Sequence, residues 1–242
     1  MTTTENTAIV TGGGKRVGAA IVAAMLADGW RVVAHVHHEG DTVPEGAIKV
    51  VADLADADCA ETIFAAAGGP VALLVNNAAR FQWDGFGAPS PSGFDAHMAV
   101  NARAPMLLTD ALARRHAAGT TALAVNILDA KLAAPNPDFL SYTLSKYAAA
   151  GLTELAARAL AGKGIRVNAI APALMLPSGA QDEADYARVH ALNPLARGVE
   201  VADVVAALRF LIAQPAMTGQ TLTIDGGQRF MALPRDVQFV EP

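Results

Sequence analysis

The sequence predicts an α/β protein built on a doubly wound, open parallel sheet of seven strands. Short runs rich in Val, Ile, Leu and Ala alternate along it with longer Ala-rich stretches of helical period. These runs are apolar at every position, as expected of strands that helices cover on both faces. Ligands of such sheets bind outside the carboxyl ends of the strands, so we expect the functional residues there.

The predicted elements follow one another in β-α order. Each strand is an apolar run bounded by Gly, Asn, Asp or Pro, and the seven runs cover residues 7–11, 31–36, 48–52, 71–75, 120–127, 165–170 and 220–224. The helices are predicted between them, at residues 17–28, 56–67, 93–117, 139–161, 182–192 and 200–213. Since no linker, repeat or low-complexity tract divides the chain, we expect residues 1–242 to form a single domain.

The composition argues against several classes of protein. The 242 residues are 52% hydrophobic and 17% charged, with a net charge of -5, which is typical of a globular chain. The single cysteine, Cys59, excludes an intrachain disulfide and a multi-cysteine zinc site and favours a reducing compartment. The chain shows no basic region before an apolar stretch at its start, no apolar run of about 18 residues, and no cluster of Lys or Arg. We expect a cytoplasmic protein that binds neither membranes nor nucleic acid.

A glycine-rich turn, TGGGKRVG at residues 11–18, follows the first strand and opens the first helix. Glycines let the backbone approach a phosphate closely, and the unpaired amides and dipole of a helix N-terminus favour an anion. The turn does not fit G-x-G-x-x-G, because position 17 is Val. Taken alone, it is equally consistent with a tight turn that binds nothing.

Motifs along nearly the whole chain resemble those of the short-chain dehydrogenase/reductase family. The turn at residues 11–18 is similar to T-G-x-x-x-G-x-G, with Arg16 where the middle glycine usually stands. Further matches are Asp53-Leu54 to an adenine-contacting pair, Asn76-Asn77-Ala78-Ala79 to N-N-A-G, Asn101 to a helix asparagine, Tyr142 and Lys146 to Y-x-x-x-K, residues 166–173 to R-V-N-x-I-x-P-G, and Asp225-Gly226-Gly227. Each motif is weak alone, but their order and spacing are specific. The resemblance implies a Rossmann-type fold, a nicotinamide cofactor and a homotetramer of paired helices.

Tyr142 and Lys146 lie four residues apart on a predicted helix and therefore share one face. A phenol is a poor acid or base at neutral pH, but a nearby ammonium and an oxidised nicotinamide favour phenolate and bring the pKa of Tyr142 towards the working range. Without the other motifs, a buried tyrosine and a solvated lysine that share a face by chance would be the simpler interpretation.

Position 129, thirteen residues before Tyr142, is Asp where the family normally has a serine that hydrogen-bonds the substrate oxygen. An aspartic acid shielded from water beside a ligand can stay protonated and donate that proton, which suits reduction of a ring C=N bond. The alternative is a solvated Asp129 in a degenerate, inactive site. Because Tyr142, Lys146 and Asn101 are retained, we favour the active site.

One branch of the family, the pteridine reductases and related dihydropterin reductases, has this aspartate. Residues 14–18 resemble the branch's x-K-R-L-G loop, and residues 35–38 resemble its H-Y-H-R, with Val36 in place of the tyrosine. Phe81 stands where the branch has a phenylalanine that sandwiches the pterin against nicotinamide. Phe81 can also be a plain loop anchor.

The end of the second strand favours NADP(H). A carboxylate there would bind the ribose hydroxyls of NAD, but position 36 is Val, while Arg16, His37 and His38 offer donors for a 2′-phosphate. The expected cofactor-binding residues are Thr11, Gly12, Gly14, Lys15, Arg16, Val17, Gly18, His37, His38, Asp53, Leu54, Asn77, Ala78, Ala79, Tyr142, Lys146 and Pro172. No third ligand accompanies His35 and His37, so we expect no metal.

The leading hypothesis is an NADPH-dependent reductase of a pterin or dihydropterin, with dihydrofolate as a further substrate. The catalytic residues would be Tyr142 and Asp129 as proton sources, Lys146 on the nicotinamide ribose, and Asn101 holding a relay water. The substrate-binding residues would be Arg16, Phe81, Asp129 and Tyr142, with Arg16 bridging cofactor phosphate and substrate. The alternatives are a general short-chain carbonyl or alcohol oxidoreductase and a non-catalytic dinucleotide-sensing protein.

Overall fold

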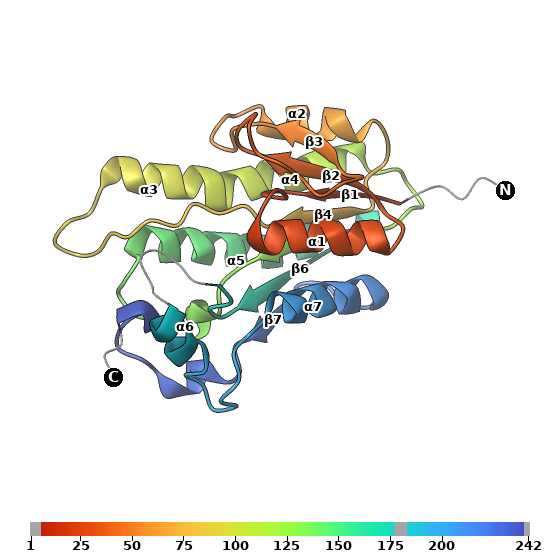
Figure 1. The fold of residues 1–242 in the computed structure, drawn as a ribbon. Coiled ribbons are helices and arrows are strands. Elements are labelled where there is room, and N and C mark those ends of the chain that lie inside the picture. Colours follow the sequence, from red (N-terminus) through yellow and green to blue (C-terminus); the bar gives the residue numbers. More distant parts are fainter. Residues whose placement is uncertain (1–5, 177–182, 240–242) are drawn as a thin grey trace.

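Seven parallel strands form one sheet in the order β3-β2-β1-β4-β5-β6-β7 in the described part of the chain (Figure 1). This computed structural model describes residues 6–176 and 183–239. The strands are β1 (Thr7–Val10), β2 (Arg31–Val36), β3 (Ile48–Val51), β4 (Leu73–Asn76), β5 (Ala122–Ile127), β6 (Ile165–Pro172) and β7 (Thr221–Ile224). The order of the strands reverses between β1 and β4, which is where such sheets open a crevice for ligands.

Helices cover both faces of the sheet. Helices α1 (Arg16–Ala27) and α7 (Val201–Ala213) pack on one face, and α2 (Cys59–Ala67), α4 (Ala104–Arg115) and α5 (Leu140–Leu160) pack on the other. In β1, Ile9 faces the second group while Ala8 and Val10 face the first, and all three are fully buried. The strands are therefore apolar at every position because helices cover both faces of the sheet, as predicted.

The remaining elements lie mostly around the carboxyl ends of the strands. Figure 1 shows α6 (Glu183–His190) and the C-terminal segment beyond the carboxyl end of β6. The other elements are α3 (Pro91–Met98), a π-helical turn (Ala99–Arg103) and the 3-10 turns Ala130–Ala133, Ala161–Lys163, Gln228–Met231 and Val237–Phe239. No helix of the described residues is long and apolar enough to cross a membrane.

The predicted elements agree with these bounds to within a few residues, with one main difference. The helix expected at 93–117 is three pieces, because the π-helical turn separates α3 from α4. Asn101 lies in that turn and bonds to Arg80 and Ser145 from other segments, a constraint that helical periodicity does not report. The first residue of the helix predicted at 182–192 lies outside the described residues, and α6 is its described part.

Candidate active site

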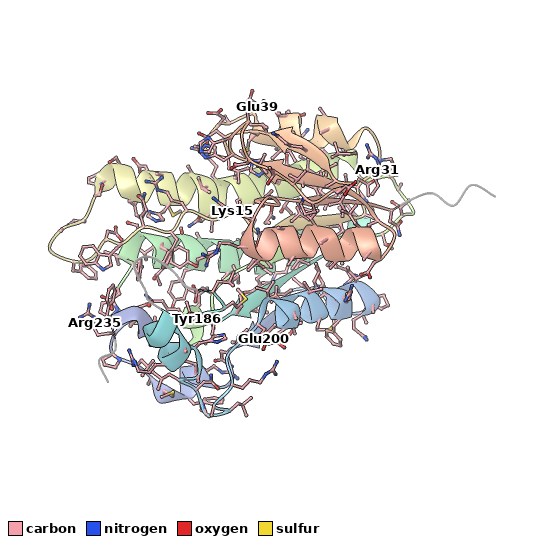
Figure 2. The ribbon with its side chains drawn as sticks, in the orientation of Figure 1. Lys15, Arg31, Glu39, Tyr186, Glu200 and Arg235 are labelled. Carbon is pink, nitrogen blue, oxygen red and sulfur yellow. The ribbon has the colours of Figure 1, made fainter. Side chains whose placement is uncertain are left out.

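A cleft of about 1020 Å³ runs along the carboxyl ends of the strands. The loops after β1, β2 and β3 line one end, and residues after β5 and β6 and the C-terminal segment line the other. Figure 2 labels Lys15 at the start of α1 and Arg235 on the C-terminal segment, and both residues line this cleft. The dimensions and position suit an extended ligand such as a dinucleotide with a second molecule beside it.

The glycine-rich turn is closely packed. Gly12 adopts a left-handed conformation (φ +64°), and a Cβ on Gly18 would overlap the Gly12 carbonyl oxygen. A Cβ on Gly14 would lie 2.5 Å from the Thr42 carbonyl oxygen. Gly14 and Gly18 line the cleft directly, so the glycines keep the backbone of the turn open to a ligand.

Arg16 stands at a glycine position of the family pattern and has the backbone conformation of a glycine there. Its φ is +52°, the left-handed conformation that a glycine adopts without strain and that costs other residues about 1–2 kcal/mol. The backbone therefore keeps the shape that the family pattern describes. Unlike a glycine, Arg16 also contributes a charged side chain to the cleft lining at the N-terminus of α1.

His35 braces the turn from β2. Its Nδ1 accepts a hydrogen bond from the Gly12 amide at 3.2 Å, and its Nε2 donates to the Ala52 carbonyl at 3.0 Å. Burial lowers the pKa of His35, so the neutral ring that both bonds require is favoured. Within residues 6–176 and 183–239, no group of three or more His, Cys, Asp or Glu is arranged to hold a metal ion.

The end of the cleft after β2 and β3 is rich in nitrogen donors. Lys15, Arg16, His37 and His38 line it, and Val36 is buried at the tip of β2. His37 Nε2 lies 3.6 Å from Asp53 Oδ2, and the His37 and His38 rings are 4.0 Å apart. This set of donors, without a carboxylate on β2, fits the 2′-phosphate of NADP.

Two carboxylates border the donors. Asp41 Oδ2 accepts the His38 amide at 3.0 Å, and this bond is the main reason why the pKa of Asp41 is lowered. Asp53 Oδ1 accepts the Ala55 amide at 2.8 Å, and both Asp53 and Leu54 line the cleft. Asp53 and Leu54 therefore lie on the cleft wall beside the donors, and their contact with an adenine stays a prediction.

Thr11 and Asn101 lie behind the cleft wall rather than on it. Thr11 Oγ1 accepts the amides of Asn77 and Ala78, each at 3.0 Å, and so holds the turn after β4. The Asn101 side chain accepts the Arg80 amide at 2.7 Å and donates to the Arg80 carbonyl and to Ser145 Oγ. Neither residue lines the cleft, whereas Asn77, Ala78, Ala79 and Pro172 do. The relay-water role of Asn101 stays a prediction.

Asp129, Tyr142 and Lys146 meet at the middle of the cleft. The Tyr142 hydroxyl donates to Asp129 Oδ2 at 2.8 Å, while Asp129 Oδ1 accepts the Lys131 amide at 2.9 Å. Lys146 Nζ donates to the Ile127 carbonyl at 2.7 Å and lies 5.6 Å from the centroid of the Tyr142 ring. The spacing of Tyr142 and Lys146 on α5 therefore brings them to the end of β5, where Asp129 follows.

The pKa of Tyr142 is raised well above that of a free phenol. Burial is the largest cause, and the negative charge of Asp129 and the hydrogen bond to it act in the same direction. The sequence predicted the opposite direction because it weighed the ammonium of Lys146 and the nicotinamide and left out the adjacent carboxylate. Tyr142 therefore carries its proton at neutral pH, as a proton donor in a reduction must.

The pKa of Lys146 is lowered to about 8 by burial. Its ammonium is therefore lost as pH rises through about 8, so we expect kcat/KM to fall above that pH. The pH profile of Lys146→Arg tests this, because the guanidinium stays charged and the residual activity should show no alkaline limb near pH 8. An identical limb in both proteins would assign it to another group.

Three aromatic rings line up beside this centre. The Phe81 ring stacks on Phe139 with centroids 4.3 Å apart, and meets Tyr142 edge-on at 4.7 Å. Phe139 is buried, precedes α5 and has a φ of +54°, a strained conformation for a bulky residue. Phe81 keeps 40% of its surface exposed and lines the cleft, so it can present a face to a flat ligand.

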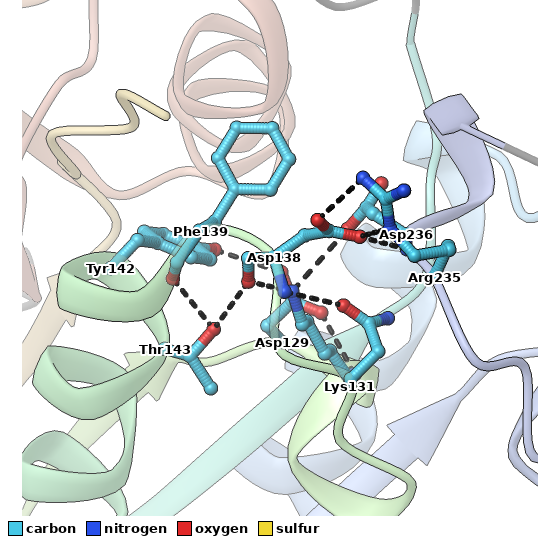
Figure 3. A network of polar contacts seen from close by, with 9 residues as sticks. Asp129, Lys131, Asp138, Phe139, Tyr142, Thr143, Arg235 and Asp236 are labelled. Atoms are coloured by element: carbon cyan, nitrogen blue, oxygen red, sulfur yellow. Dashed lines mark hydrogen bonds and ion pairs between the residues drawn. The ribbon is translucent and has the colours of Figure 1, made fainter. Parts of the chain in front are cut away.

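Sequence reasoning missed a polar cluster at the substrate end. Figure 3 shows Lys131, Asp138, Arg235 and Asp236 joined beside Asp129 and Tyr142. Asp138 and Arg235 are 97 residues apart, and no motif contains either residue. Only the folded chain brings them together.

The fold and the site are those of a nicotinamide-dependent reductase, and comparisons with known proteins identify the family. The family model described as enoyl-(acyl carrier protein) reductase matches residues 14–229, and the chain belongs to the short-chain dehydrogenase/reductase family. The predicted family and Rossmann-type fold are thus confirmed.

The related proteins include reductases of a sugar, of pteridines and of dihydrofolate. L-xylulose reductase from Bos taurus is 35% identical, over 91% of this chain and 95% of the relative. Pteridine reductase 1 from Leishmania tarentolae is 32% identical, over 93% of this chain and 96% of the relative. The crystal structure of FolM alternative dihydrofolate reductase 1 from Brucella suis in complex with NADP has a TM-score of 0.84 and 34% identity, covering 95% of this chain and 97% of that one.

Proposed function

We propose that this protein is an NADPH-dependent reductase of a dihydropterin, with dihydrofolate as a further substrate. The observation that carries the proposal is the hydrogen bond of 2.8 Å between the Tyr142 hydroxyl and Asp129, at the position where the family normally has serine. The likeness to pteridine and dihydrofolate reductases supports the same branch.

The cofactor of this short-chain oxidoreductase is NADP(H). The glycine-rich turn at the start of α1 would hold the pyrophosphate, and Arg16, His37 and His38 the 2′-phosphate. Lys146, one helical turn after Tyr142 on α5, would hold the nicotinamide ribose. When bound, NADPH supplies the hydride for the reduction.

Preference for NADPH over NADH is expected to be at least about tenfold in kcat/KM, which corresponds to about 1.4 kcal/mol. Val36→Asp should shift the preference towards NADH, because the carboxylate would repel a 2′-phosphate and accept ribose hydroxyls. Val36→Asn is the matched control. Asparagine has the size of aspartate without its charge, so this variant should shift the preference much less. Equal or better use of NADH by the unmodified protein would contradict the assignment.

The residues at the centre of the cleft suit proton delivery to a ring. Tyr142 carries a proton at neutral pH, and its hydroxyl donates to Asp129, which lies next to it as acceptor and relay of that proton. When NADPH transfers hydride to a ring carbon, Asp129 can take the Tyr142 proton and pass it to the adjacent ring nitrogen. Phe81 would stack on the ring while the proton is transferred.

Reduction of a simple sugar ketone is the second candidate function. It is favoured by the 35% identity to L-xylulose reductase and by the Tyr142 and Lys146 pair, which would serve a carbonyl equally well. Asp129 argues against it, because a carboxylate repels the oxyanion that develops when a ketone is reduced.

Turnover measured side by side tests the proposed function. NADPH oxidation would be followed with a dihydropterin, dihydrofolate and L-xylulose at matched concentrations. A dihydropterin should give the highest kcat/KM. A higher value for L-xylulose would replace the proposal by the second candidate.

We also propose a homotetramer and a cytoplasmic location. Exposed apolar side chains on α4 and α5, including Met106, Leu144, Tyr147 and Leu155, support an association surface. Sedimentation equilibrium would test the assembly, and a monomer would contradict it. Cell fractionation would test the location.

A further inference from the structure

The chain returns to the substrate end of the cleft after β7. Leu233, Arg235 and Asp236 line the cleft although they lie beyond the last family motif. We refer to residues 233–237 as the C-terminal wall. Figure 3 shows the contacts of Arg235 and Asp236 in this wall with Asp138 and Lys131.

One carboxylate holds the C-terminal wall. Asp138 Oδ2 accepts from Arg235 Nε and Oδ1 from Arg235 Nη2, both at 2.8 Å, and Oδ2 also accepts the Asp236 amide at 2.8 Å. The Asp138 side chain is 8% exposed and that of Arg235 51%, so the carboxylate is buried under the guanidinium. The Arg235 guanidinium lowers the pKa of Asp138, in keeping with a charged pair.

A lysine forms a second link between the C-terminal wall and the active site. Lys131 Nζ lies 3.5 Å from Asp236 Oδ2 and donates to the Asp138 carbonyl oxygen. The Lys131 amide donates to Asp129 Oδ1, so one residue contacts both the catalytic aspartate and the C-terminal wall.

The same carboxylate adjoins the catalytic helix. Asp138 directly precedes Phe139, whose backbone is strained, and α5 begins at the next residue. Phe139 stacks on Phe81 and also on Phe239, whose ring centroid is 5.9 Å away and lies beneath the Arg235 guanidinium. Polar and aromatic contacts therefore both connect the C-terminal wall to the place where Phe81 would receive a substrate.

We propose that Asp138 and Arg235 are positioning residues that clamp the C-terminal wall across the substrate end of the cleft and thereby set the affinity for substrate. The pair touches no reacting atom. If Arg235 is removed, the buried Asp138 carboxylate loses its counter-charge. If Asp138 is removed, the C-terminal wall loses the contacts that hold it against the rest of the cleft. The proposal rests on the proposed function only for the choice of dihydropterin as the substrate of the assay.

The experiment compares Asp138→Asn, Arg235→Gln and the double variant with the unmodified protein. Each single variant should raise KM for the dihydropterin about tenfold, while kcat falls less than about threefold, because positioning is lost and the proton-transfer groups are kept. The double variant should be no worse than either single variant, because both changes break one interaction. NADPH affinity, measured by fluorescence titration, should change less than about twofold, because the phosphate-binding residues are at the other end of the cleft.

Arg209→Gln is the matched control. Arg209, on α7, forms a bidentate pair of the same kind with Asp28 at the end of α1, at 2.8 and 2.9 Å, and neither residue lines the cleft. It should leave KM unchanged. Arg235→Lys, which keeps the charge and loses the two-pronged geometry, provides a conservative variant if Asp138→Asn does not fold, and should raise KM less than Arg235→Gln.

An unchanged KM in the Arg235 variants would overturn the proposal. A parallel loss of NADPH affinity and of thermal stability would also overturn it, since this would show a role in folding alone. If the unmodified protein reduces L-xylulose and no dihydropterin, the proposed function fails while the clamp is still tested, with L-xylulose as the substrate of the same variants.

Discussion

Replacing Tyr142 by phenylalanine is expected to lower kcat by roughly 10²–10⁴-fold, the usual contribution of a positioned acid or base. The substitution keeps the ring that packs edge-on against Phe81 and removes only the hydroxyl that donates to Asp129. Because the phenol carries its proton at neutral pH, its loss removes the proton that the reduction consumes. Steady-state kinetics with a dihydropterin and NADPH measure the effect.

The control for this variant lies on the same helix. Tyr147 donates its hydroxyl to the Leu132 carbonyl at 3.1 Å, is 42% exposed and does not line the cleft, so Tyr147→Phe should keep kcat within about twofold. NADPH affinity should barely change in Tyr142→Phe. Retained turnover in Tyr142→Phe would show that the Y-x-x-x-K match has no catalytic meaning in this chain.

The fold could be predicted because each strand and helix leaves a pattern in consecutive residues of the sequence. Each strand buries consecutive residues on both faces, as Ala8, Ile9 and Val10 do in β1, and this leaves a continuous apolar run that is visible in the sequence. The interruption at Asn101 was not predictable in this way. Its cause is a set of hydrogen bonds to Arg80 and Ser145, which lie 21 and 44 residues away.

Some features of the candidate site were likewise visible in the sequence, and others depend on contacts that only the folded chain makes. Tyr142, Lys146 and Asp129 were predictable because they stand at the positions of a family motif, and the four-residue spacing of Tyr142 and Lys146 alone showed only that the two share a helix face. The direction of the pKa shift of Tyr142 was not predictable, since it depends on the burial of the phenol and on its contact with the Asp129 carboxylate. The Asp138 and Arg235 pair spans 97 residues and leaves no local pattern.

Asp129 decides between the two enzyme hypotheses, and its replacement by serine is expected to abolish most dihydropterin reduction, by about 10²-fold or more. A serine hydroxyl polarises a carbonyl oxygen but does not readily release a proton to a ring nitrogen. Asp129 also uses two oxygens, one for the Tyr142 hydroxyl and one for the Lys131 amide, and a serine has one.

Weak reduction of L-xylulose should persist or appear in Asp129→Ser, because the site then has the ordinary family pattern of serine, tyrosine and lysine. Asp129→Asn is the matched variant: it keeps the shape and an oxygen that can accept the Tyr142 hydrogen bond, but an amide does not take up and release a proton, so it should lose most activity on dihydropterins. Both variants would be assayed on both substrates with saturating NADPH. If the unmodified protein reduces L-xylulose better than the dihydropterin, and Asp129→Ser improves that activity, the carboxylate is a hindrance in a carbonyl reductase and the pterin assignment is wrong.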